Sequence, residues 1–159
     1  MSTDAADGVV RRVVAEIRRH GLVSAGDRVL VGVGLPSSLG GLATVGLFVR
    51  AAEALGVAEV AVASIERGCE LDDDAESVAD VGRVARELGL SFFAVRPQRQ
   101  PDAAGVVDEL RALAEQHGYQ RVALGHTRED AAAAALSAFA RGVGVVEARQ
   151  ACVGASVAG

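Results

Sequence analysis

The stretch DRVLVGVGLPSSLGGL, residues 27–42, decides the fold. Its apolar run Val29–Val33 predicts a strand buried on both faces of a parallel sheet. A turn of Gly, Leu, Pro and two Ser follows, and the apolar stretch Leu39–Val49 then predicts a buried helix. A strand, a Gly/Ser turn and a helix N-terminus often bind an anion, because backbone N–H groups and the helix dipole converge there. The stretch has no Walker lysine and no GxGxxG, so a phosphate site and a plain connection remain equal alternatives.

The composition indicates one globular domain without an obvious nucleic-acid face. The 159 residues are 50% hydrophobic and 23% charged, aromatic residues make up 3%, and the formal net charge is -5. Cys69 and Cys152 lie far apart and form no CxxC, so no metal site is predicted. The polar N-terminus is unlike a secretory signal, and no apolar run reaches the roughly 20 residues of a membrane span. We therefore expect a cytoplasmic protein without a membrane partner.

Helices and strands alternate along the chain. Helices are predicted over residues 4–20, 39–55, 103–118, 131–141 and between Asp74 and Gly89, and strands over 29–33, 57–65, 91–95 and 120–125. Val9 and Leu88 are placed on the inner faces of the first and third helices. Right-handed crossovers then give a doubly wound parallel sheet, a three-layer α/β/α fold. Residues 1–145 form this domain, and residues 146–159 form a short tail with a candidate edge strand at Val145–Cys152.

Glycines in the second helix indicate close packing. Gly40, Gly41 and Gly46 each weaken the helix by about 1 kcal/mol against Ala. We expect them to pack against the sheet or against another chain. Three polar turns, Gly34–Ser38, Ser64–Gly68 and Gly125–Asp130, follow three of the strands. Ligands of doubly wound sheets bind at the carboxyl ends of strands, so the turns predict a nucleotide-sized site.

Taken together, these turns resemble the PP-loop family, the N-type ATP pyrophosphatases, and within it the tRNA(Ile) lysidine synthetases. Family members carry GDRVLVAVSGGxDS, then HVDHGLR, then ALGHTxDDQAET followed by LLRG. The corresponding stretches here are GDRVLVGVGLPSS at 26–38, ASIERGC at 63–69, and ALGHTREDAAAA at 123–134, followed by ARG at 140–142. The resemblance covers roughly residues 9–146 and implies an adenine nucleotide alpha hydrolase-like fold.

The resemblance implies ATP-dependent adenylation of a tRNA base, with Mg²⁺ as a cofactor. It places phosphate at Gly34, Ser37 and Ser38, adenine near Ser64, Ile65 and Glu66, and the opposite wall at Gly125, His126 and Asp130. The sequence departs from the family in the phosphate loop. Leu35-Pro36 replaces the Gly pair or follows a one-residue deletion, and Ser37 lies where the Asp is expected. Proline has no N–H to donate, and the lost carboxylate removes a hard oxygen ligand for Mg²⁺.

Two functional hypotheses follow. In the first, the chain is a degenerate, non-catalytic PP-loop domain that binds neither ATP nor Mg²⁺ and works as a scaffold or regulator, through a homo-oligomer or a protein partner. In the second, it is an ATP-binding tRNA-modifying enzyme that needs a separate tRNA-binding partner. For each site residue a plain structural role is the alternative, such as helix capping by Ser37 or Ser38.

Overall fold

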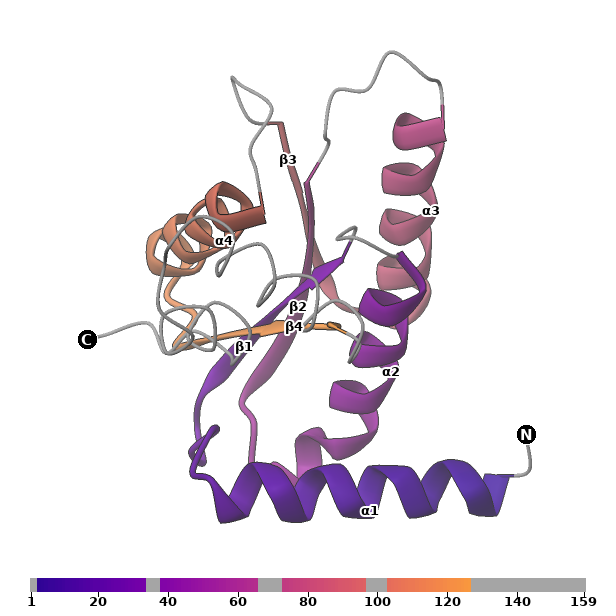
Figure 1. Cartoon of the computed structure of the whole chain (residues 1–159), viewed down its shortest axis with the longest axis vertical. Helices are drawn as coiled ribbons and strands as arrows, with labels where there is room; N and C mark the ends of the chain where they lie inside the picture. The colour runs from indigo at the N-terminus through magenta and orange to yellow at the C-terminus, as the bar shows by residue number, and fades with distance from the viewer. Residues whose placement is uncertain (1–2, 34–37, 66–72, 97–102, 127–159) are drawn as a thin grey trace, which may run out of the picture.

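The computed structural model describes residues 3–33, 38–65, 73–96 and 103–126, and these alternate between helix and strand as expected (Figure 1). The elements in chain order are α1 (Thr3–Arg19), β1 (Arg28–Val33), α2 (Ser38–Leu55), β2 (Glu59–Ile65), α3 (Asp73–Glu87), β3 (Ser91–Val95), α4 (Ala103–His117) and β4 (Arg121–Leu124). Each lies within two residues of its predicted bounds. The predicted helix at 131–141 and the tail at 146–159 lie outside the described residues.

All strand pairs of the sheet are parallel, and the strand order is β3-β2-β1-β4. The first three strands are added in one direction, and β4 is then placed on the other side of β1. The strand order therefore reverses between β1 and β4. The fold class predicted from the sequence, a doubly wound parallel sheet, is confirmed in this part of the chain.

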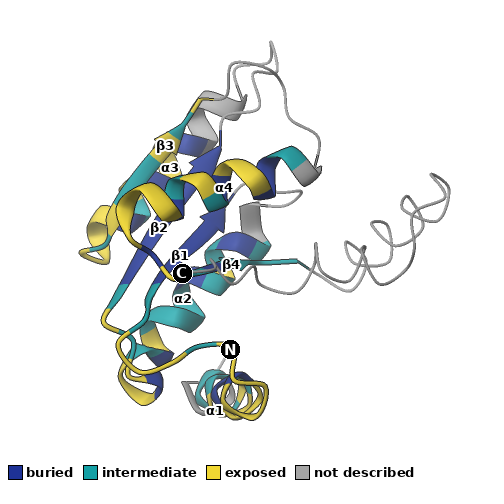
Figure 2. Ribbon diagram, turned by 90° about the vertical axis from the view of Figure 1, so that its left-hand side faces the viewer, coloured by how far each residue is buried: buried dark blue, intermediate teal, exposed yellow. Residues whose placement is uncertain are grey.

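Each face of the sheet carries its own hydrophobic core. Neighbouring residues of β1 point to opposite faces, so Leu30 packs with α4, whereas Val29 and Val31 pack with α2 and α3. In Figure 2 the buried residues line the strands between the two helical layers, while the outer side of α4 is exposed. Val29, Leu30 and Val31 have no exposed surface, so the fold is built around β1.

The N-terminal helix α1 covers the lower part of α2 (Figure 1). Val14 and Ile17 pack against Ala51 and Leu55, and Arg50 of α2 pairs with an acidic residue of α1. Two predicted inner residues are on the surface instead: Val9 is 40% exposed, and Leu88 is 45% exposed. The prediction for Leu88 is wrong because α3 ends at Glu87, so Leu88 has left the helical period.

Two glycines of α2 have different surroundings. A Cβ on Gly41 would lie 2.8 Å from the Cα of Val33, so Gly41 lets the first turn of α2 pack on the end of β1. A Cβ on Gly46 would meet nothing within 4 Å. Close packing on the sheet is therefore confirmed for Gly41. Gly46 does not pack closely, so close packing does not explain a glycine at that position.

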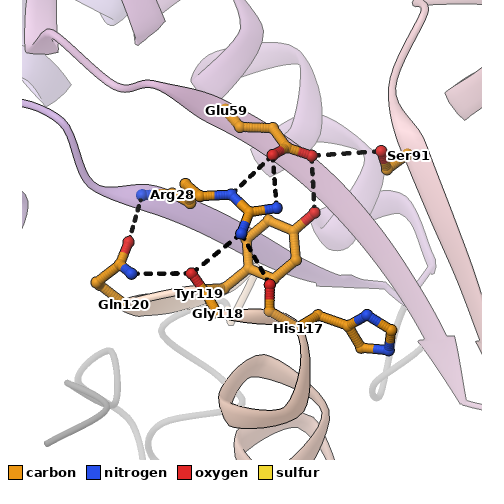
Figure 3. Close-up of polar contacts among 7 residues, drawn as sticks. All are labelled: Arg28, Glu59, Ser91, His117, Gly118, Tyr119 and Gln120. Carbon is orange, nitrogen blue, oxygen red and sulfur yellow. Dashed lines mark hydrogen bonds and ion pairs between the residues drawn. The ribbon is translucent and has the colours of Figure 1, made fainter. Parts of the chain in front are cut away.

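A polar network joins the amino ends of the strands (Figure 3). The Arg28 guanidinium of β1 binds the Glu59 carboxylate of β2 at 2.7 Å and lies over the Tyr119 ring, 4.4 Å from its centre. Glu59 also accepts hydrogen bonds from the Tyr119 hydroxyl at 2.8 Å and from Ser91 of β3 at 3.3 Å. The side chain of Gln120 accepts from the backbone N–H of Arg28 at 2.8 Å. The network links all four strands at one edge and so helps to fix their register.

The two glycines of α2 give a matched pair of substitutions. Gly46→Ala should raise the free energy of unfolding by about 0.5–1 kcal/mol, because a helical glycine is replaced without a clash. Gly41→Ala gains the same helix propensity but forces a side chain onto the backbone of Val33, and should lower stability by about 1–3 kcal/mol. Urea denaturation of both variants measures the difference. Equal effects would contradict the close packing of α2 on β1.

The network also predicts a pH dependence of stability. The pKa of Glu59 lies below its ordinary value of 4.5, first because the Tyr119 hydroxyl donates to the carboxylate and then because Arg28 pairs with it. A lowered pKa in the folded state adds stability above the unfolded pKa, and that stability is lost as the pH falls through the folded value. Urea midpoints between about pH 5 and pH 3 should therefore fall more steeply for the wild type than for Glu59→Gln. The fall of the urea midpoint for Tyr119→Phe should lie between those of the wild type and Glu59→Gln. The same fall in all three proteins would refute the role of the network.

Candidate functional site

The candidate site lies at the carboxyl ends of β1, β2 and β4. The strand order reverses between β1 and β4, and ligands of doubly wound sheets bind at such a point. The helix α2 begins there at Ser38, and its first turn contains no acidic residue. No carboxylate of that turn would therefore repel an anion that binds the backbone N–H groups at the helix N-terminus.

The nine predicted site residues are only partly covered by the described residues. Gly34, Ser37, Glu66 and Asp130 lie outside them. Ser38 is the first residue of α2, Ser64 and Ile65 are the last two residues of β2, and Gly125 and His126 follow β4 directly. The parallel pairing of β2, β1 and β4 brings the ends of these three strands to one edge of the sheet.

The predicted adenine contacts Ser64 and Ile65 do not share one surface. Ser64 is 2% exposed, and Ile65 is 5% exposed and belongs to the core beneath α4. Because adjacent strand residues point to opposite faces, the side chain of Ser64 lies on the α2 and α3 face instead. The side chains of Ser64 and Ile65 therefore lie on opposite faces of the sheet, and the placement of adenine near the end of β2 stays a prediction.

Gly125 brings the end of β4 into contact with the start of α2. A Cβ on Gly125 would lie 2.2 Å from the carbonyl oxygen of Gly40 and 2.7 Å from the backbone nitrogen of Gly41. Only glycine permits this approach of two backbones. Gly41 is in turn pressed against Val33 of β1, so the first turn of α2 is fixed between β1 and β4.

His126, one of the predicted site residues, is a polar group at this edge. Its Nδ1 is buried, and it has no hydrogen-bond partner within the described part of the chain. A buried polar atom without a partner costs roughly 1–3 kcal/mol, which a ligand atom could recover. The side chain as a whole is only half-buried. His126 is therefore the residue of this edge with an open capacity for a polar contact.

Two features were not predicted from the sequence. The first is the contact between Gly125 and Gly40, and the second is the polar network around Arg28. The signal for the first was the Gly40-Gly41 pair, which was predicted to pack closely but without a partner on β4. The signal for the second was a charged residue at the first position of β1, β2 and β4, namely Arg28, Glu59 and Arg121. Arg121 pairs with Asp27 at 2.9 Å, so it too belongs to the edge opposite the candidate site.

Comparisons with known proteins support the fold. No protein-family model matches the sequence, and no curated protein matches it. Among solved structures, the chain is similar to the U34-tRNA thiolase NcsA from Methanococcus maripaludis, with a TM-score of 0.68 and 14% identity. The match covers 85% of this chain and 49% of the thiolase, so the chain spans about half the length of that protein. The likeness supports the fold alone, a parallel sheet between layers of helices.

The thiolase structure contains a 4Fe-4S cluster. Within the described ranges of this chain, no group of three or more His, Cys, Asp or Glu side chains is placed to hold a metal ion. Cys69 and Cys152 lie outside those ranges. Of the helices that the structure describes, none is long and apolar enough to cross a membrane.

The contact of Gly125 with Gly40 predicts a stability effect. Gly125→Ala should lower the free energy of unfolding by about 1–3 kcal/mol, because the added methyl meets backbone atoms that cannot rotate away. Chemical denaturation beside Gly46→Ala, the unobstructed glycine substitution, provides the measurement and its control. A Gly125→Ala protein as stable as the wild type would show that β4 and α2 are not in backbone contact.

Proposed function

We propose that the chain is a degenerate PP-loop domain that acts as a scaffold or regulatory protein through protein contacts and does not adenylate a substrate. Its fold is that of an adenine nucleotide alpha hydrolase-like domain, which supports the family resemblance at the level of architecture. The resemblance to lysidine synthetases rests on the sequence motifs alone.

The observation that carries the proposal is the burial of the described side chains at the ends of β1 and β2. Val33 is 3% exposed, and Ser64 and Ile65 are equally inaccessible. A purine ring needs an exposed surface on which to lie, with a few polar groups directed at its edge. The described ends of β1 and β2 offer buried side chains instead.

The donor set does not fit an ATP–Mg²⁺ complex. The loop has Pro36, which cannot donate a backbone hydrogen bond, and Leu35 beside it in place of a glycine. Ser37 stands where the family has an aspartate, and a neutral hydroxyl is a poor substitute for a carboxylate as a Mg²⁺ ligand. We therefore assign no reaction step to ATP in this chain.

A second candidate function is an ATP-binding, tRNA-modifying enzyme. Two observations favour it: the unpartnered Nδ1 of His126 at the reversal of strand order, and the fold shared with a U34-tRNA thiolase. This alternative includes a separate tRNA-binding partner.

Calorimetric titration with ATP and Mg²⁺ separates the two functions. The scaffold function predicts no detectable heat up to about 1 mM ATP, a concentration at which even weak specific binding is measurable. The enzyme function predicts micromolar binding that Ser38→Ala weakens about tenfold, as expected for the loss of one phosphate contact of about 1.4 kcal/mol.

The control for Ser38→Ala is Ser24→Ala, which removes the same hydroxyl near the opposite edge of the sheet. Binding that only Ser38→Ala weakens would overturn the scaffold function. Binding that neither substitution changes would place the nucleotide elsewhere on the protein and would contradict both functions at this site.

A further inference from the structure

The strand β3 forms an outer edge of the sheet that the structure describes. It pairs with β2, from Ala61↔Ser91 to Ile65↔Val95, and no other described strand pairs with its second edge. Its sequence, SFFAV, contains no charge and no proline. Natural edge strands usually carry a Lys, a Pro, a bulge or a cover, because a bare edge pairs with other strands.

The side chains of β3 also stay partly uncovered. Ser91 and Ala94 are exposed, and the two phenylalanines and Val95 are only half-buried. Phe92 lies on α3, with its Cε1 2.9 Å from where a Cβ of Gly82 would be. Phe93 lies on the other face beside His117, with a ring distance of 4.5 Å. In Figure 2, β3 lies at the margin of the sheet. Both of its faces are therefore packed, and no other described strand lies along its outer edge.

The surroundings of β3 favour a neutral partner. Leu88, just before the strand, exposes 45% of its surface. Among the charged residues of α3 before the strand, Arg83 binds Asp80 at 3.2 Å and Glu87 at 3.1 Å, and Arg86 donates to the backbone carbonyl of Gly82 at 3.3 Å. The charges of this ion-pair cluster therefore neutralise one another and offer little attraction to a strongly charged partner. An uncharged strand such as β3 is suited to pairing with another uncharged strand.

We propose that two copies of this chain associate by antiparallel pairing of their β3 strands. Antiparallel pairing about a two-fold axis is self-complementary: with the axis at Phe93, Ser91 of one copy lies opposite Val95 of the other. The two four-stranded sheets become one continuous sheet. Leu88 and Phe92 of each copy lie beside the junction and add apolar contact area. In the proposed scaffold function, the second copy of this chain is the protein partner. The role of the dimer rests on that proposed function.

The test is the mass of the full-length protein in solution, measured by light scattering between about 1 μM and about 100 μM, the range of modest affinities. The wild type should form a dimer at the upper end. Ala94→Lys places a charge on the exposed alanine of the strand, opposite Phe92 of the other copy, and should leave a monomer. Ala43→Lys, the same change at an exposed alanine of α2, should leave the dimer intact.

Hydrogen exchange of the wild type gives a second measurement that needs no substitution. Amide exchange in residues 91–95 should slow as the protein concentration rises, whereas exchange in β1 should not depend on concentration. A monomer at the highest concentration, a monomer produced by Ala43→Lys, or exchange in β3 that ignores concentration would each overturn the proposal. The last result would mean that the edge is covered within one chain.

Neither measurement uses a nucleotide. A dimer that also binds ATP would contradict the scaffold function and leave the β3 interface standing. A monomer that binds no ATP would contradict the interface and leave the absence of adenylation standing.

Discussion

The first turn of α2 reaches the sheet only because two glycines have no side chains. Gly41 lies against the backbone of Val33, and Gly125 lies against the carbonyl of Gly40. These contacts fix the helix between β1 and β4, where the strand order reverses. These contacts set the position of the first turn of α2 relative to the ends of β1 and β4, where the candidate site lies.

The two edges of the sheet are built in opposite ways. The amino edge holds a dense polar network in which Arg28, Glu59 and Tyr119 satisfy one another. At the carboxyl edge, the described side chains at the ends of β1 and β2 are buried, and the Nδ1 of His126 is a buried polar atom without a hydrogen-bond partner among the described residues.

The sequence was sufficient to predict the fold, because hydrophobic periodicity and glycine stops depend on local physics. The run Val29–Val33 predicted the central strand, and Gly89, with φ of 70°, ends the α3 region as expected. The site was less predictable. Ser64 and Ile65 lie at the end of β2 as expected, but strand alternation turns their side chains to opposite faces of the sheet. The Gly40-Gly41 pair indicated close packing, but its partner Gly125 was not predictable, because a contact between glycines far apart in sequence leaves no pattern that pairs them.

Under the proposed function, the carboxyl edge of the sheet does not bind a nucleotide. Amide chemical-shift mapping of the labelled protein with ATP and Mg²⁺ tests it residue by residue. The account predicts no shift changes that cluster at Ser38, Ser64, Gly125 and His126, even at millimolar nucleotide. Saturable shifts confined to these four amides would contradict it and would establish a working nucleotide site at the reversal of strand order.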